Sequence, residues 1–275
     1  TSIEESEVFG NFKVGTPIDL NRSIMGKFSI TSGRNSYSYY LTDNFTSYDV
    51  PDMTGITYVS PALILERNTT NYKIYPTAGI KQKLTASYAF ITSDYTPGST
   101  SEEMVPYVNR IDNRFKLNFY SEIYHPVNKW LTIGSLVDFN LSTEVALGDY
   151  ISSLIITPAF QPTPHSKTLL LKDYRANSYL ALGVNPIVHI SGTIFISTLV
   201  SYFQPYKVVT RGTNGGRGIN DIFPKGDFMA NIAAVWQSPV GPVSLSASYY
   251  PGADVKWYPQ FNIGFLIFRN KSLNY

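Results

Sequence analysis

The sequence predicts an all-β protein, a transmembrane antiparallel β-barrel in which about a dozen strands are visible. Three observations predict this class. Charged residues are few while aromatic residues are many, several segments alternate strictly between apolar and polar residues, and short turns alternate with long polar connections. Together they describe strands with one face suited to lipid and the other suited to water.

The composition departs from that of an ordinary soluble domain. Charged residues make up 15% of the chain, where about 25% is typical, and aromatic residues also reach 15%. The mean hydropathy is -0.08, and no stretch approaches the roughly 18 to 20 apolar residues that a spanning helix needs. A closed barrel can cross a bilayer with every second residue polar, because its backbone groups pair between strands.

Several function classes are disfavoured by the sequence. A net charge of +2 without a basic stripe gives no reason to expect a nucleic-acid partner. The absence of cysteine excludes a disulfide scaffold and a thiol nucleophile. His125, His165 and His189 are scattered without ligand spacing, and the glycine-rich residues 212–218 match no phosphate-binding motif. We therefore expect no metal, no cofactor and no catalytic residues.

Period-two alternation is clearest in residues 115–123, where Phe115, Leu117 and Phe119 share one face and Lys116 and Asn118 share the other. Residues 131–141 and 243–250 repeat this pattern. On the terminal strand the predicted lipid face consists of Phe261, Ile263, Phe265 and Ile267.

Charged residues occupy the opposite, lumen-facing positions of these strands. At the bilayer midplane an Arg or Lys facing lipid would cost about 2–4 kcal/mol. The predicted lumen-facing charges could pair with one another inside the barrel or select solutes in a pore. They are Arg114, Lys116, Glu122, Asp138 and Glu144.

Connections supply the third observation. Turns rich in Pro, Gly or Asn are predicted near residues 67–70, 125–128, 190–192 and 239–242, and longer polar connections at residues 42–53, 94–106, 148–177 and 207–225. Runs such as residues 109–124 and 130–147 exceed the usual 5 to 6 residues of a globular strand, which disfavours a soluble β-sandwich. The strands before residue 54 are left open. No linker divides the chain, so residues 1–275 are expected to form one domain.

Five short segments follow one another in a specific order. They are Ser60-Pro61 with residues 66–69 (ERNT), residues 158–168 (PAFQPTPHSKT), 174–179 (YRANSY), 238–245 (SPVGPVSL) and 261–268 (FNIGFLIF). With them, residues 60–275 resemble the C-terminal barrel of Bacteroidetes-type patatin-like outer-membrane phospholipases, a branch of the Omp85-like surface-antigen barrels.

The resemblance implies a parent protein with a hydrolase domain and a barrel of about sixteen strands; the chain would hold part of that barrel or be a smaller relative. It also implies a long loop, here residues 148–177, that folds into the lumen, with His165, Lys167 and Arg175 as candidate lumen residues. Where that group has Arg-Gly-Phe or Arg-Gly-Tyr, this chain has Arg175-Ala176-Asn177. The Gly-x-Ser-x-Gly elbow of a patatin site is absent from the chain.

Two functions follow as hypotheses. The chain anchors or exports an attached domain without catalysis of its own, or it is a stand-alone pore or subunit of an outer-membrane assembly. The expected location is the outer membrane of a Gram-negative cell. The expected partners are outer-membrane lipid, the barrel-assembly machinery during insertion, and further copies of the chain or other outer-membrane proteins.

Overall fold

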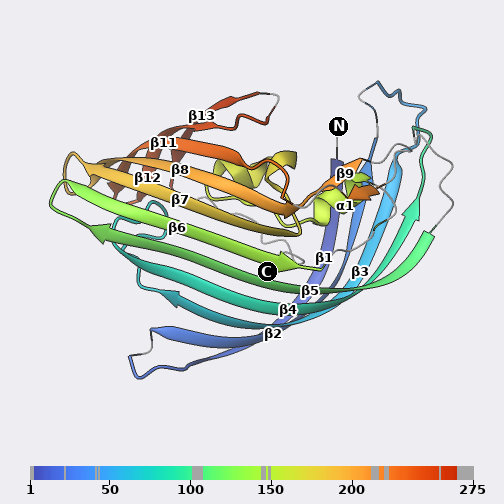
Figure 1. Cartoon of the computed structure of the whole chain (residues 1–275), viewed down its shortest axis with the longest axis horizontal. Coiled ribbons are helices and arrows are strands. Elements are labelled where there is room, and N and C mark those ends of the chain that lie inside the picture. Colours follow the sequence, from blue (N-terminus) through green and yellow to red (C-terminus); the bar gives the residue numbers. More distant parts are fainter. Residues whose placement is uncertain are drawn as a thin grey trace.

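The computed structural model describes residues 3–21, 23–40, 42, 44–100, 108–143, 147, 150–211, 217–219, 223–253 and 255–264. Most of this part belongs to one antiparallel sheet of eleven strands, each paired with its neighbours along the chain (Figure 1). The strands are β1 (Ile3–Pro17), β2 (Ile24–Tyr39), β3 (Asp52–Asn68), β4 (Gly79–Thr96), β5 (Val108–Pro126), β6 (Leu131–Ser142), β7 (Ser178–His189), β8 (Ile194–Lys207), β11 (Asp227–Ser238), β12 (Gly241–Tyr249) and β13 (Trp257–Ile263). The predicted all-β, antiparallel class is confirmed.

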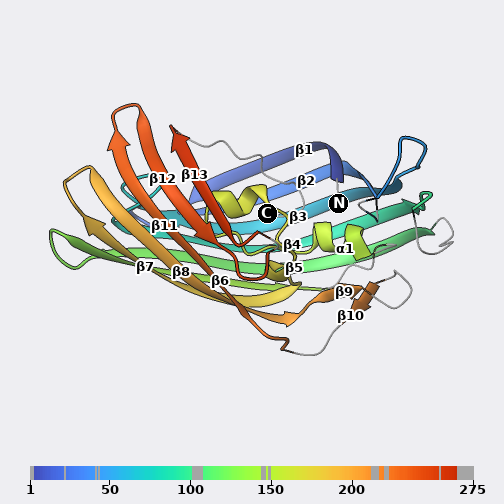
Figure 2. The ribbon, with the colours of Figure 1, turned by 90° about the horizontal axis from the view of Figure 1, so that it is seen from above.

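The sheet is strongly curved, and its concave side holds the helical segments of the chain (Figures 1 and 2). These are α1 (Tyr150–Ile156), η1 (His165–Thr168) and η2 (Lys172–Tyr174), all from the connection between β6 and β7. Strands β9 (Val209–Arg211) and β10 (Arg217–Ile219) form a separate hairpin. Within the described residues β1 and β13 are the two edges of the main sheet.

Alternating side chains create the two faces of this sheet. On β5, Arg114 and Lys116 are buried on the inner face, whereas Phe115 is 40% exposed on the outer face. The register continues these faces onto the next strand, because Phe119 pairs with Phe139 and Tyr120 with Asp138.

The outer face is apolar along its whole width. Large exposed hydrophobic side chains occur on the outward positions of β2 to β8 and β11 to β13. They include Phe28, Ile30, Val59, Leu63, Leu84, Phe90, Phe115, Ile123, Phe139, Leu141, Leu180, Leu182, Ile196, Val200, Ile232, Leu245 and Phe261. Buried polar side chains such as Ser29, Thr31, Arg114 and Asp138 are turned inward, which is the reverse of a soluble sheet with one wet face. The ion pair of Arg34 with Asp94 is an exception at outward positions of β2 and β4.

The predicted alternation of short and long connections is present for most of the sheet, although residues 69–78 at the first end are longer than residues 250–256 at the second. Residues 18–23, 69–78, 127–130, 190–193 and 239–240 join strands at one end, and residues 40–51, 97–107, 143–177, 208–226 and 250–256 join them at the other. Strand lengths of 18 residues in β4 and 19 in β5 agree with the expectation of long strands.

Two boundaries differ from the prediction. The turn expected at residues 67–70 is a longer connection, because the side chain of Asn71 organises it: its Oδ1 accepts from the backbone N–H groups of Thr77 and Ala78 at 3.0 and 3.1 Å. The strand expected over residues 130–147 ends at Ser142, and the chain turns inward so that Leu147 lies buried in the interior.

None of the helices in the described part is long and apolar enough to cross a membrane.

Candidate functional site

The interior of the curved sheet is filled by residues 147 and 150–177, here called the inner segment. In its first half, α1 packs against the sheet: Ile151, Ile155 and Ile156 share one buried cluster with side chains of β2, β3 and β4. The strand side of this cluster consists of Tyr37, Tyr39, Ile56, Tyr58, Ala89 and Ile91. Burial of this apolar surface fixes α1 against the strands, because a helix of seven residues is not stable by itself.

The second half of the inner segment packs on the opposite part of the sheet. Phe160 stacks on Phe203 of β8 with ring centroids 5.9 Å apart, and Tyr179 of β7 lies against both rings. The Tyr174 hydroxyl donates to the carbonyl of Phe228 in β11 at 2.6 Å. The inner segment therefore spans the concave face from β2–β4 to β7–β11.

Arg175 ties the two halves of the inner segment together. It is 6% exposed, and its guanidinium Nη1 donates to the carbonyls of Leu154, Ile155 and Thr157 at 3.2, 3.0 and 3.0 Å. Burial lowers the pKa of Arg175 to about 10, so the side chain stays charged at neutral pH. These three carbonyls belong to the inner segment itself, although the resemblance made this residue a candidate for contacts inside the lumen.

Arg114 completes the same contact from the sheet. This β5 residue donates through Nη1 to the carbonyl of Ile156 at 3.1 Å and through Nε to Ser142 Oγ at 3.0 Å. The last carbonyls of a helix have no partner within the helix. Two arginines, one from the sheet and one from the inner segment, bind them here.

The other predicted inner-face charges lie apart from this contact. Asp138 accepts from the side chains of Asn118 at 2.9 Å and Tyr179 at 3.0 Å. Lys116 is buried at 7% exposure on the same face. Glu144 lies outside the described residues.

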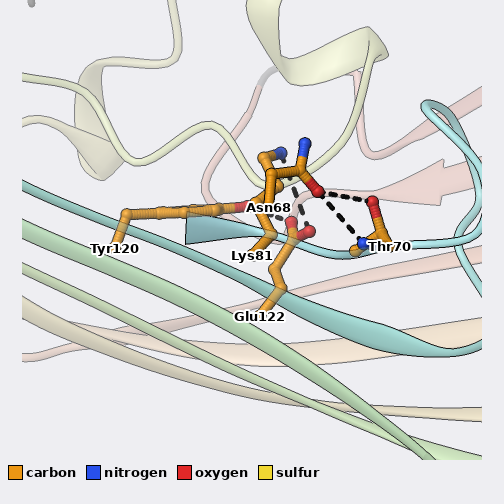
Figure 3. A network of polar contacts seen from close by, with 5 residues as sticks. All are labelled: Asn68, Thr70, Lys81, Tyr120 and Glu122. Carbon is orange, nitrogen blue, oxygen red and sulfur yellow. Dashed lines mark hydrogen bonds and ion pairs between the residues drawn. The ribbon is translucent and has the colours of Figure 1, made fainter. Parts of the chain in front are cut away.

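Glu122 takes part in a separate polar network with residues of β4 and β5 (Figure 3). Its carboxylate accepts a hydrogen bond from the Tyr120 hydroxyl, and its Oε2 lies 3.7 Å from Lys81 Nζ. The ammonium of Lys81 also lies 5.3 Å from the centroid of the Tyr120 ring. In the same view, Asn68 binds the backbone N–H and the hydroxyl of Thr70, where the chain leaves β3.

His165 lies where the inner segment meets β12 and β13. It is 7% exposed, its Nδ1 is 3.3 Å from the Tyr250 hydroxyl, and its ring centroid is 4.7 Å from that of Tyr258. Burial lowers the pKa of His165, which favours the neutral imidazole in the folded protein. The residue therefore packs against aromatic rings, and Lys167, two positions on, turns toward a cavity.

A second inward-folded segment, residues 69–78 between β3 and β4, reaches across the concave face. The Tyr75 hydroxyl lies 3.3 Å from Ser244 Oγ in β12, and Gln237 of β11 donates to the carbonyl of Ile74 at 3.0 Å. Tyr75 adopts a left-handed backbone conformation, with φ of 55°, at this contact.

A cavity of about 250 Å³ lies between the two inward-folded segments and the strands. Its charged lining residues are Lys73, Lys81, Lys167 and Glu122. Neither Lys73 nor Lys81 is among the residues predicted from the sequence. Lys81 shares the period-two alternation of Lys83 and Thr85, which would have placed it on the inner face.

The remaining predicted positions are on the terminal strand. Phe261 and Ile263 of β13 are 63% and 67% exposed, on the outer face. Phe265 and Ile267 lie outside the described residues. Among described residues no group of three or more His, Asp or Glu side chains could hold a metal ion.

Comparison with known proteins gives little further information. No protein-family model matches the chain, and no curated protein matches it in sequence. Among solved structures it is similar to BamA from Haemophilus ducreyi lacking POTRA domains 1–3, with 13% identity and a TM-score of 0.40, over 93% of this chain and 60% of that one. A TM-score of 0.40 is too low for the likeness to support an inference about this chain.

Proposed function

We propose that the chain is an integral outer-membrane β-barrel. One observation carries the proposal: the curved sheet has an apolar outer face across ten of its strands, while charged side chains such as Arg114, Lys116 and Asp138 are buried on its inner face. Exposure of that outer face to water would be unfavourable because it is apolar, whereas contact with lipid hydrocarbon removes it from water. The long strands and the alternation of short and long connections support the same placement.

Anchoring of an attached domain is favoured over an open pore. The inner segment and residues 69–78 both fold into the concave face, and the space left between them is a cavity of about 250 Å³. A wide aqueous channel would need that interior to be free. The finer proposal, that the attached domain is a patatin-like hydrolase of the Bacteroidetes type, is supported by the resemblance of five short segments, among them residues 158–168 and 261–268.

Membrane placement is tested by extraction and by gel mobility. We expect the chain to leave the membrane fraction only with detergent and to migrate faster on a denaturing gel unheated than boiled, because a closed barrel resists unfolding. A monomer that is soluble in plain buffer without detergent would overturn the proposal.

We further propose that these residues perform no ester hydrolysis. The chain has no Gly-x-Ser-x-Gly elbow, and no motif supplies a nucleophile with a base and an oxyanion donor. A chromogenic ester assay on the purified chain should give the buffer rate. Turnover that is abolished by replacing one serine or histidine would contradict this.

A further inference from the structure

We propose that the cavity between the inner segment and residues 69–78 binds a small organic anion, with a carboxylate or phosphate held by Lys73, Lys81 and Lys167. This proposal does not depend on the membrane placement, because it concerns the folded interior alone.

The charges around the cavity come from three separate elements. Lys81 projects from β4, Lys167 from η1 and Lys73 from the β3–β4 connection, while Glu122 of β5 is the one acidic residue among the described residues of the lining. When all four are ionised, three positive charges and one negative charge leave an excess of two positive charges. Glu122 is already engaged by the Tyr120 hydroxyl and lies 3.7 Å from Lys81.

Lys81 and Lys167 line the same cavity. Burial lowers the pKa of Lys167, the charge of Lys81 lowers it further, and Glu122 opposes the shift. An anion placed between the two ammonium groups would replace their repulsion with two charge-assisted hydrogen bonds. Lysine binds phosphate and carboxylate in this way, as a compact point charge on a flexible stem.

The rest of the lining suits the organic part of such a ligand. Apolar contact is offered by Ile74, Pro76, Leu136, Pro162 and Leu199. Neutral polar side chains, among them Tyr124, Asn185 and Asn231, lie on the strand side. At about 250 Å³ the cavity is below the roughly 300–1,000 Å³ typical of sites for drug-sized ligands, which points to a small molecule.

Titration calorimetry on the folded, purified full-length chain tests the proposal with three probes of equal chain length: hexanoate, hexyl phosphate and hexanol. We expect both anions to bind at least about tenfold more tightly than hexanol, since only they pair with the lysines. Equal affinity for hexanol and the anions, or no binding of any probe at millimolar concentration, would overturn it.

Lysine variants test which side chains bind the anion. Lys167→Met and Lys73→Met should each weaken anion binding by about tenfold, while Lys129→Met, which removes the same charge from the turn between β5 and β6, should leave it unchanged. Circular dichroism and the thermal transition confirm that each variant is folded. Lys81→Met is a weaker test, because Lys81 also faces Glu122. A loss with Lys129→Met equal to the loss with Lys167→Met would contradict the site.

Competition by dihexanoyl phosphatidic acid separates two sources of the anion. Displacement of hexyl phosphate at equal concentration supports a lipid headgroup in the site, and failure to displace it supports a free solute. In both cases the anion site stands. Because the readout is binding by folded protein, failure of this proposal is distinguishable from failure of the membrane proposal, which depends on extraction and gel mobility.

Discussion

At the scale of single residues, the most consequential contact is the one at the end of α1. Arg175 and Arg114 bind the carbonyls of the last three residues of α1 and of Thr157, which follows it. The residues of this helix from Ile151 to Ile156 are all buried. Buried carbonyls without partners cost about 1–3 kcal/mol each. The two arginines therefore hold a helix inside the sheet that would not form in water.

Replacement of Arg175 by Met should loosen the inner segment. The variant keeps most of the apolar stem but removes the guanidinium that donates to three carbonyls, of which that of Leu154 still accepts from the backbone N–H of Thr157 at 3.2 Å. We expect trypsin to cleave after the exposed Lys167 and Lys172 at least about tenfold faster than in the parent protein, because local opening becomes more frequent.

The matched control for this experiment is Arg34→Met. Arg34 is on β2, its side chain is 65% exposed, and it lies 3.8 Å from Asp94. Removal of such an exposed pair has little effect. Unchanged cleavage in Arg175→Met, or equal acceleration in both variants, would show that the guanidinium does not hold the segment.

At the scale of elements, the sequence predicts the faces of the strands but not what packs inside them. Alternation in residues 115–123 places Lys116 and Phe115 on the faces where the structure has them, because a period of two is a local property of the backbone. Helix α1 gives no such local signal, because its seven residues are too few for a helical period to be distinguished from a short apolar run. The partners of Arg175 and Tyr75 are likewise set by contacts distant in sequence, which no pattern reports.

Strand β5 allows the two faces to be compared directly. Phe119→Arg places a charge on the outer face, where a bilayer would impose a cost of about 2–4 kcal/mol at its midplane, and should sharply reduce membrane assembly. Asn118→Arg places the same charge on the inner face beside Asp138, and we expect a mild effect. The measurement is the yield of the heat-sensitive, fast-migrating gel band.

Two outcomes of the comparison on β5 would contradict the assignment of its faces. If the two variants assemble equally well, the outer face does not meet hydrocarbon. If Asn118→Arg is the more damaging, the pairing register differs by one residue from the one described, which would exchange the faces.

At the scale of the whole molecule, the two ends of the sheet differ in their connections. The short connections include residues 239–240, and the long ones include residues 40–51 and the inner segment. In outer-membrane barrels the longer loops are extracellular and the shorter turns periplasmic. This difference predicts one orientation of the chain.

Cysteine labelling tests that orientation, and the chain has no native cysteine to interfere. Tyr48→Cys lies in a long connection at 94% exposure, and Val240→Cys lies in a short turn at 82%. On intact cells a membrane-impermeant maleimide should label the first and reach the second only after the outer membrane is permeabilised. Equal labelling of both on intact cells would contradict the orientation.

The contact of residues 69–78 with β11 and β12 has a consequence for the order of folding. Strand neighbours in the sheet are also neighbours in the chain, so hairpins can form one after another as the polypeptide is added. Tyr75 and Ser244 are instead separated by 169 positions, and the entropy of closing so long a loop opposes early contact. We therefore expect the contact between Tyr75 and Ser244 to form last, after β11 and β12 have paired with the strands before them. A chain that stops short of Gln237 would keep its early hairpins yet leave Ile74 and Tyr75 without their hydrogen-bond partners on β11 and β12.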